Sequence, residues 1–415
     1  MTDIKELCQR AKAASRKMAV LDPKIKARAL KSMAKALIDN SAHIIGENIK
    51  DVDRARKNNI SKVLIDRLTL DEKRIKAMAA SLIEISKLKD PIGEVLEIRR
   101  RPNSLLIKKV RVPIGVILCI YESRPNVTSD CVGLSLKSGN CVILRGGSDA
   151  INSNTAIFEA LNGEALKNDI PEGAITMIKD TDRSVVNDLL AQEGLIDLVM
   201  PRGGESLIRE VTDNSKIPVI KHYKGVCHTY VDGSADLNMA MRICYNAKVQ
   251  RPGVCNAMET MLVNKKIAQK FLPSMIKQLK DAGVEIRGCG ETIRIVPGIN
   301  KASEEDWYAE YLDLILSVRV VNDLDEAIEH IMKYGSYHSD AIITKDKKAA
   351  EKFLNNVDSA CVYVNASTRF TDGGEFGKGA EIGISTDKIH ARGPVGVEEL
   401  TSYKYVIYGK GQIRK

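Results

Sequence analysis

The sequence predicts an α/β protein with two doubly wound α/β domains and a projecting β-hairpin. Short, almost continuously apolar strands alternate with amphipathic helices in two blocks, one beginning near residue 112 and the other after about Tyr230. The chain has 415 residues, and a single hydrophobic core stops growing at roughly 250–300 residues. We therefore expect more than one domain.

Composition excludes several classes of protein. Lys and Arg exceed Asp and Glu by 63 to 54, which favours anionic ligands. Aromatic residues are only 4%, and the basic residues are scattered among acidic ones, so we expect no nucleic-acid binding. The longest uncharged apolar stretch, Val112 to Tyr121, is about half of what a membrane span needs. With its charged N-terminal segment, the chain is expected to be a soluble, cytoplasmic protein without a membrane partner.

The nine cysteines are spaced too widely for a Cys-x-x-Cys pair. Their odd number also argues against a disulfide framework, so each is expected to be a small buried hydrophobe unless its own surroundings indicate otherwise. The spacing predicts no metal site.

The first ninety residues predict a layer of helices, because apolar residues such as Leu30, Met33 and Leu37 recur at intervals of three or four. Residues 94–111 predict an exposed β-hairpin that turns at Arg101–Ser104, and such a ribbon is a plausible oligomer arm.

The first α/β block is expected to alternate strands and helices in a parallel sheet. Its predicted strands are Gly115–Ile120, Cys141–Leu144, Ala174–Ile178 and Leu195–Met200, and its predicted helices are Val127–Lys137, Ile151–Leu166 and Glu205–Thr212. Ligands of such sheets bind beyond the carboxyl ends of the strands.

The second α/β block follows the same pattern. Its predicted helices are Leu237–Val249, Lys266–Ala282, Leu324–Tyr334 and Lys347–Asn355, and its predicted strands are Glu259–Val263, Asp340–Thr344 and Ala360–Asn365. The glycine-rich segment 372–385 is expected to be a loop, and Ser402–Tyr408 a strand-like tail that favours self-association.

Two strand ends carry an arginine followed by a glycine pair, which suits the close approach of a phosphate to the backbone. The candidate cofactor residues are Arg145, Gly146, Gly147, Ser148, Arg202, Gly203 and Gly204. No acidic residue follows Arg145 where it would hold a free ribose 2′-hydroxyl, so NADPH is preferred to NADH. An ordinary strand-to-helix turn is the alternative interpretation, because the common Gly-x-Gly-x-x-Gly and P-loop motifs are absent.

Cys255 is the cysteine whose local sequence argues for exposure. It follows Pro252 and Gly253, between a predicted helix and a predicted strand, and Arg251 or nearby backbone amides could favour its thiolate. A nucleophilic role competes here with that of an ordinary loop cysteine.

Several longer segments resemble one family. Gln250–Thr260, Val321–Ile342, Phe370–Ser385 and His390–Pro394, with Asn48–Arg54 near the start, are similar to the gamma-glutamyl phosphate reductase branch of the aldehyde dehydrogenase superfamily. The similarity extends over nearly the whole chain.

The resemblance implies an aldehyde dehydrogenase-like fold with three parts. These are an NADP(H)-binding domain of residues 1–93 and 112–225, an oligomerisation module of residues 94–111 and 386–415, and a catalytic domain of residues 226–385. The superfamily places its catalytic cysteine between the cofactor-binding domain and the catalytic domain, and this resemblance identifies Cys255 as the nucleophile.

The resemblance also assigns roles to single residues. Arg145 corresponds to the residue near the adenosine phosphate, Glu310 to the glutamate that holds the nicotinamide ribose, and Asn126 to an oxyanion-stabilising asparagine, although the alignment can slip onto Arg124. Arg124 and Arg251 are candidates for the substrate's phosphate or carboxylate, with an ordinary ion pair as the alternative.

The implied activity is the NADPH-dependent reduction of L-glutamyl 5-phosphate to L-glutamate 5-semialdehyde, the second step of proline biosynthesis from glutamate. His222 stands where hydrolytic aldehyde dehydrogenases carry a water-activating glutamate, and this loss suits a reductase. The partners expected are a small-molecule substrate, further copies of the chain and, in transient contact, a separate glutamate 5-kinase. Another aldehyde or acyl-CoA dehydrogenase and a non-catalytic basic binding protein are the rival classes.

Overall fold

The computed structural model describes residues 3–414, with the side chains of residues 62 and 63 left out of the description. The chain divides into two compact units. The first unit comprises Met1–Lys221, Gly377–Gly383 and Val395–Lys415, and the second comprises His222–Phe376 and Ile384–Pro394. Among the described residues, no helix combines the length and apolar character that crossing a membrane requires.

The first unit is built on a parallel sheet with the strand order β5-β4-β3-β6. Every residue of β3 and β4 is buried, as expected of parallel strands covered by helices on both faces. The strands are β3 (Val116–Tyr121), β4 (Cys141–Gly146), β5 (Ile175–Met177) and β6 (Leu198–Arg202). The elements between and after them are α6 (Asn126–Lys137), η1 (Ser148–Ala150), α7 (Ile151–Lys167), α8 (Ser184–Leu190) and α9 (Glu205–Asn214).

The N-terminal segment forms the predicted helical layer. Asp3, Asp22 and Asp71 each accept a hydrogen bond from a backbone N–H of the helix that they precede, which satisfies part of its first turn. The apolar stripe of α2 is fully buried, as its three-to-four spacing predicts. The helices are α1 (Ile4–Met18), α2 (Pro23–Asp39), α3 (Ser41–Lys57), α4 (Lys62–Leu68) and α5 (Glu72–Lys87).

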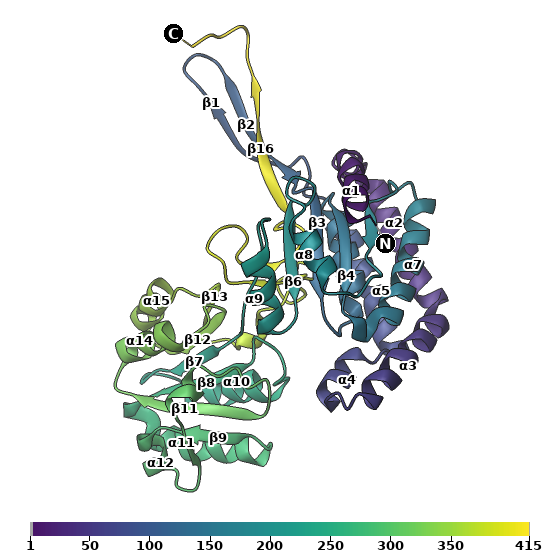
Figure 1. Ribbon diagram of the computed structural model, residues 1–415. Coiled ribbons are helices and arrows are strands. Elements are labelled where there is room, and N and C mark those ends of the chain that lie inside the picture. Colours follow the sequence, from purple (N-terminus) through teal and green to yellow (C-terminus); the bar gives the residue numbers. More distant parts are fainter. Residues whose placement is uncertain (1–2, 415) are drawn as a thin grey trace. The chain divides into compact units, whose positions relative to one another are not determined.

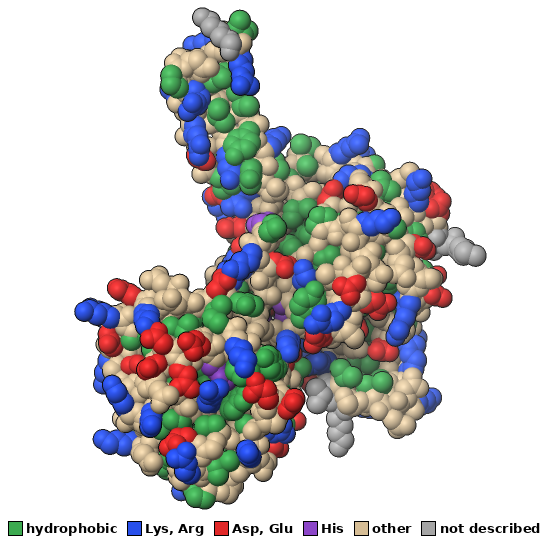
Figure 2. Space-filling model, turned by 60° about the vertical axis from the view of Figure 1, so that its left-hand side comes forward, with side chains coloured by type: hydrophobic (Ala, Val, Ile, Leu, Met, Phe, Trp, Pro, Cys, Tyr) green, Lys and Arg blue, Asp and Glu red, His purple; other side chains and the backbone are tan. Residues whose placement is uncertain are grey.

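The predicted hairpin is present, and the C-terminal tail adds a third strand to it. β1 (Val95–Arg100) pairs antiparallel with β2 (Leu106–Pro113), and β2 pairs antiparallel with β16 (Thr401–Tyr408) along all eight residues. This arm is labelled in Figure 1, and Figure 2 shows hydrophobic and basic side chains together on its surface. The exposed apolar residues include Ile98, Tyr405 and Ile407.

The second unit contains a seven-stranded sheet with the order β10-β9-β11-β8-β7-β12-β13, in which every neighbouring pair is parallel. The strands are β7 (Cys227–Val231), β8 (Met258–Asn264), β9 (Glu285–Gly288), β10 (Asn300–Lys301), β11 (Ile315–Val321), β12 (Ser339–Ile343) and β13 (Cys361–Val364). The helices are α10 (Leu237–Val249), α11 (Lys265–Asp281), α12 (Gly290–Ile295), α13 (Glu304–Trp307), α14 (Leu324–Tyr334), α15 (Lys347–Asn356) and the short 3₁₀ helix η2 (Thr368–Phe370). A separate two-stranded sheet is formed by β14 (Gly383–Ser385) and β15 (Gly393–Val395).

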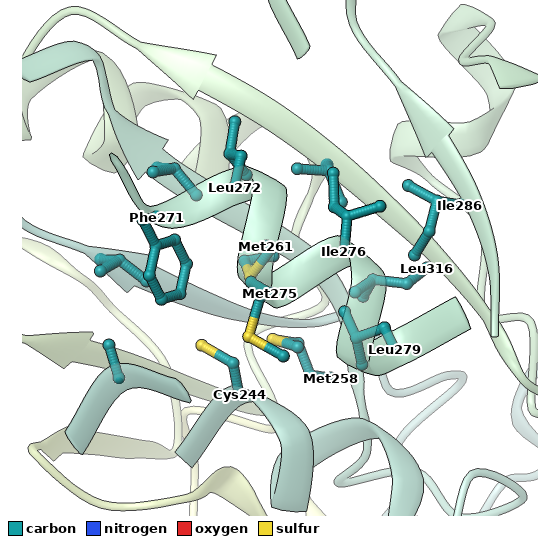
Figure 3. Close-up of a cluster of buried hydrophobic side chains, with 14 of the residues drawn as sticks. Cys244, Met258, Met261, Phe271, Leu272, Met275, Ile276, Leu279, Ile286 and Leu316 are labelled. Carbon is teal, nitrogen blue, oxygen red and sulfur yellow. The ribbon is translucent and has the colours of Figure 1, made fainter. Parts of the chain in front are cut away.

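One core cluster of the second unit lies between this sheet and α10 and α11 (Figure 3), and another lies between the sheet and α14 and α15. Met258 and Met261 of β8 contribute to the same fully buried cluster as Phe271 and Met275 of α11 and Cys244 of α10. Unbranched methionine side chains fill irregular space between packed elements. Cys244 is therefore a core residue, as its place on an apolar helix stripe predicts.

Two central strands differ from the sequence-based expectation. β7 and β11 were not among the predicted strands, because polar residues interrupt both Cys-His-Thr-Tyr-Val and Ile-Leu-Ser-Val-Arg-Val-Val. In the fold these polar side chains find partners: His228 bonds to Asp340, and Ser317 bonds to Tyr311. The predicted strand Leu195–Met200 is also shifted, since β6 begins at Leu198 and continues through Pro201 to Arg202.

A buried ion pair joins α10 to β8. Lys248 Nζ lies 2.6 Å from Glu259 Oε2, and both side chains are completely inaccessible to solvent. Burial raises the pKa of Glu259 to about 7 and lowers the pKa of Lys248, while the attraction between the two groups opposes both shifts. Each charge is therefore tolerated only because the other is present.

Replacing Lys248 with methionine is expected to lower the free energy of unfolding by about 3–5 kcal/mol, because it leaves the Glu259 carboxyl group buried without its partner. Chemical denaturation of the variant measures this loss. The double variant Lys248→Met, Glu259→Gln removes both charges and should recover part of it. A loss below about 1 kcal/mol in the single variant would contradict the expected dependence of one charge on the other.

Candidate active site

Cys255 is more accessible to solvent than most of the other cysteines. Seven of the nine are buried, while Cys255 and Cys289 are half-buried. Burial raises the pKa of Cys8 to about 11 and that of Cys141 to about 12, so these two thiols are unreactive near neutral pH. Cys255 lies in the loop between α10 and β8, as predicted.

The loop that carries Cys255 is held by its neighbour Asn256, which is buried. The Asn256 side-chain amide donates to the carbonyl oxygen of Thr371 at 2.7 Å, and Thr368 Oγ1 donates to the Asn256 carbonyl oxygen at 2.7 Å. The Arg369 guanidinium donates to the Asn256 side-chain oxygen and, at 2.9 Å, to Gln250 Oε1. The nucleophile candidate is thus fixed to the segment 368–371.

A second segment packs directly against the same loop. A Cβ atom on Gly225 would lie 1.9 Å from the carbonyl oxygen of Cys255, so no other residue fits there without displacing the backbone. The buried Cys227 thiol lies 3.2 Å from that carbonyl oxygen as its hydrogen-bond donor. Glu310 Oε1 accepts from the Gly225 N–H at 2.8 Å, so its carboxylate holds this segment.

These residues gather at the amino-terminal edge of the second unit's parallel sheet. Cys227 begins β7, Cys255 precedes β8 and His338 precedes β12. Ligands of open α/β sheets are expected at the opposite, carboxyl-terminal edge. The general rule for ligand binding in parallel sheets would therefore have placed this site at the wrong edge of the sheet.

Two histidines lie beside the thiol. One side-chain donor atom from each of His222, Cys255 and His338 lies within 4.8 Å of the other two. Burial lowers the pKa of His338 to about 4, so its imidazole is neutral near pH 7. His338 Nδ1 is 2.9 Å from Ser339 Oγ, while its Nε2 is buried without a hydrogen-bond partner.

Two arginines, Arg251 and Arg369, lie near the Cys255 loop. Burial lowers the pKa of the Arg369 guanidinium, and the nearby Arg251 lowers it further, while Cys255 is close enough to oppose the shift. Arg251 was a sequence-predicted substrate residue, and the structure adds Arg369 and Asn256. Asn256 lies in the family-like segment Gln250–Thr260, but no local motif pointed to Arg369, because its contact with Asn256 joins segments more than 100 positions apart.

The remaining candidates belong to the first unit. Asn126 begins α6 and is exposed, and its side-chain amide donates to Asp130 at 3.2 Å on the same helix. Burial raises the pKa of Asp130 to about 6. Arg124 is half-buried just before this helix.

The cofactor candidates lie at the carboxyl ends of β4 and β6. A Cβ on Gly146 would approach Asn154 Nδ2 to 2.2 Å, and one on Gly203 would approach Glu122 Oε2 to 2.4 Å, so both positions require glycine or a shift of those side chains. Gly204 donates its N–H to Glu122, and no atom lies within 4 Å of where its Cβ would be. This open position stands directly before α9, whose N-cap residue offers no side-chain acceptor.

Arg145 and Ser148 differ in exposure. Arg145 is buried, with its guanidinium donating to the carbonyl oxygens of Thr181 at 2.8 Å and Asp182 at 3.2 Å, while its Nε has no partner. Burial lowers the pKa of Arg145, and Arg183 contributes to the same shift. Ser148 is exposed at the start of η1, after Gly147.

This edge of the sheet suits a dinucleotide. The chain runs from β3 through β4 to β5 and then returns to β6 on the other side of β3, so the strand order reverses between β3 and β6. Nucleotide phosphates bind at such a reversal, where a helix N-terminus faces the ligand. The uncapped start of α9 after Gly203 and Gly204 lies there.

Comparison with known proteins identifies the family of the chain. Residues 1–314 match the Aldehyde dehydrogenase family. Gamma-glutamyl phosphate reductases from Caldanaerobacter subterraneus subsp. tengcongensis and Thermoanaerobacter pseudethanolicus are 61% and 60% identical over 413 residues, covering 100% of both chains in each case. The crystal structure of gamma-glutamyl phosphate reductase from Thermotoga maritima superposes with a TM-score of 0.96 at 48% identity, covering 99% of each chain. The chain therefore belongs to the aldehyde dehydrogenase family, in its gamma-glutamyl phosphate reductase branch, and is an oxidoreductase that uses a nicotinamide cofactor.

Proposed function

We propose that this chain reduces L-glutamyl 5-phosphate to L-glutamate 5-semialdehyde with NADPH and releases phosphate, the second step of proline biosynthesis from glutamate. The observation that carries the proposal is the half-buried Cys255 thiol, in a loop anchored by Asn256 and flanked by Arg251 and Arg369. The names of the full-length relatives support the substrate class.

The first step uses only residues of the second unit. The Cys255 thiolate attacks the acyl carbon of the acyl phosphate, the carbon–oxygen bond to phosphate breaks, and a thioester to Cys255 remains. Arg251 and Arg369 stabilise the anionic leaving group, because guanidinium groups bind phosphate with paired hydrogen bonds. The neutral His338 beside the thiol is a poor proton acceptor near pH 7, so we assign it no role as the base.

The second step needs a hydride at the thioester carbon, and that is what NADPH supplies when it is bound. The resulting tetrahedral thiohemiacetal carries its negative charge on oxygen, and backbone N–H groups next to Cys255 are the nearest candidates to stabilise it, each worth roughly 3 kcal/mol. Collapse expels the thiolate and yields the semialdehyde. We keep Asn126 and Arg124 as further candidates for this oxygen.

NADPH is proposed to bind at the carboxyl ends of β4 and β6. Gly203, Gly204 and the start of α9 would hold the phosphates that link the two nucleosides, and Gly146 with Gly147 allows close approach of the backbone. Arg145 and Ser148 would favour the 2′-phosphate, Arg145 by its positive charge and Ser148 by its exposed hydroxyl group. Glu310 remains the candidate for the nicotinamide ribose.

Self-association is proposed through the arm of β1, β2 and β16. Its exposed apolar side chains form a patch of the kind that usually marks an interface, and Lys109 Nζ lies 3.7 Å from the ring centre of Tyr403 on this surface. Residues 94–111 and 386–415 would then be the oligomerisation module. Transient contact with glutamate 5-kinase, which would limit loss of the unstable acyl phosphate, is part of the same proposal.

The activity is tested in the reverse direction, with the semialdehyde, NADP⁺ and inorganic phosphate. We expect NADP⁺ reduction that requires phosphate and that is faster with NADP⁺ than with NAD⁺. Reduction that proceeds without phosphate, or that requires coenzyme A instead, would assign the chain to another aldehyde dehydrogenase reaction.

A further inference from the structure

The group of His222, Cys255 and His338 has the composition of a metal site as well as of a catalytic one. Among the described residues, no other group of three or more His, Cys, Asp or Glu side chains meets the same spacing. The sequence predicts no metal here, because the three residues are far apart in the chain and form no recognisable motif. Only the second unit's fold brings them together.

His338 is prepared as a ligand. It is completely buried, its Nδ1 lies 2.9 Å from Ser339 Oγ, and its Nε2 has no hydrogen-bond partner. A buried nitrogen without a partner is costly, and a bound cation would satisfy it. Metal-ligating histidines characteristically bond through their other ring nitrogen to a group that fixes the ring.

The hydrogen bonds that fix the His338 ring continue beyond Ser339. Ser339 Oγ lies 2.7 Å from Thr371 Oγ1, which in turn lies 2.7 Å from the Tyr363 hydroxyl group. The chain of hydroxyl groups holds the His338 ring in one orientation. His222 is half-buried and contacts His338 edge to face, with ring centres 5.6 Å apart.

The chemistry of the three side chains favours Zn²⁺ over Mg²⁺ and Ca²⁺. One thiolate and two imidazoles suit Zn²⁺, whereas Mg²⁺ and Ca²⁺ require oxygen ligands. Zinc bonds of about 2.0–2.3 Å in a tetrahedral site place ligand atoms about 3.3–3.8 Å apart. The donor atoms here already lie within 4.8 Å, so rotation of the partly exposed His222 and Cys255 side chains can close the site.

We propose that His222, Cys255 and His338 bind one Zn²⁺ ion and that the bound ion reversibly blocks the enzyme. The ion replaces the proton of the Cys255 thiol, which is released to solvent, and it forms bonds to one nitrogen of each histidine. A fourth position stays open to water. The blocking effect depends on the proposed role of Cys255 as nucleophile, whereas metal binding does not.

Cobalt provides the direct test, because tetrahedral Co²⁺ absorbs strongly in the visible range and a bound thiolate adds a charge-transfer band in the near ultraviolet. The full chain, reduced and freed of metal, is titrated with Co²⁺, and Zn²⁺ is then added to displace it. We expect one equivalent of Co²⁺ with both features. Absence of the thiolate band, or its persistence in Cys255→Ser, would overturn the proposal.

Histidine variants separate this site from adventitious binding. His222→Gln and His338→Gln should each weaken Co²⁺ binding at least about 100-fold, since even loss of an outer-shell partner costs roughly 10–100-fold. His222 is the partly exposed position, so its variant tests the site even where that of the buried His338 fails to fold. Cys289→Ser and His43→Gln, which alter a half-buried cysteine and an exposed histidine elsewhere, should bind Co²⁺ as the parent does. Unchanged binding in His222→Gln would contradict the assigned ligands.

The blocking effect is measured separately in the reverse assay. Stoichiometric Zn²⁺ should abolish phosphate-dependent NADP⁺ reduction, and a chelator should restore it. Full activity with the cobalt site saturated would overturn the block. A chain that binds cobalt through Cys255 but catalyses no such reduction would instead contradict the proposed function and leave the metal site supported.

Discussion

Replacing Cys255 with serine is expected to reduce phosphate-dependent NADP⁺ reduction at least about 10³-fold. A serine hydroxyl group is not ionised near neutral pH, so the attack on the acyl phosphate loses its nucleophile. Serine would also form an ester in place of the thioester, so the hydride-transfer step loses the sulfur that it requires. The rate is measured with the semialdehyde and phosphate at saturating concentrations. The change removes no buried side chain, so the thermal midpoint should stay close to that of the parent.

Cys289 is the matched control for this variant. It is the other half-buried cysteine, and its thiol lies 3.3 Å from Thr292 Oγ1 near the start of α12, away from the Cys255 loop in sequence and in its contacts. Cys289→Ser should keep activity within about twofold of the parent. If Cys255→Ser retained turnover within about tenfold of the parent, Cys255 could not be the nucleophile.

Replacing Gly225 with alanine is the second change with a large expected effect. The added methyl group would lie 1.9 Å from the Cys255 carbonyl oxygen and 2.6 Å from its carbonyl carbon, and both are backbone atoms that cannot rotate away. The loop must therefore move, and catalysis is sensitive to displacements of about 1 Å, which can cost about 100-fold in rate. We expect at least that loss of kcat, with a destabilisation of about 1–3 kcal/mol from overpacking.

Gly290→Ala is the control for the added methyl group. Gly290 is the first residue of α12, and nothing lies within 4 Å of the point that its Cβ would occupy, so alanine fits and is the better helix former. Stability should change by less than about 0.5 kcal/mol, with unchanged activity. Activity of Gly225→Ala equal to that of Gly290→Ala would show that the Cys255 loop tolerates movement.

Most of the fold could be predicted from local patterns. Val116–Tyr121 and Cys141–Gly146 are continuous apolar strands, and the periodic stripe of α2 is fully buried. These signals are strong because burial on both faces of a parallel sheet selects apolar residues at every position. β7 and β11 escaped prediction because their polar residues are satisfied by partners distant in sequence, such as Asp340 for His228.

The candidate site was likewise predictable only in part from the sequence. Sequence reasoning alone identified Cys255, from its proline and glycine neighbours and its resemblance to a known loop, and the structure leaves that thiol half-buried while most others are buried. The tertiary structure decided what surrounds it: Arg369 bound to the neighbouring Asn256, Gly225 against the loop backbone and His338 beside the sulfur. The local sequence indicates whether a residue is exposed and where the backbone turns. Which side chains meet at the ends of several strands depends on the order of those strands in the sheet, and no short segment of sequence specifies that order.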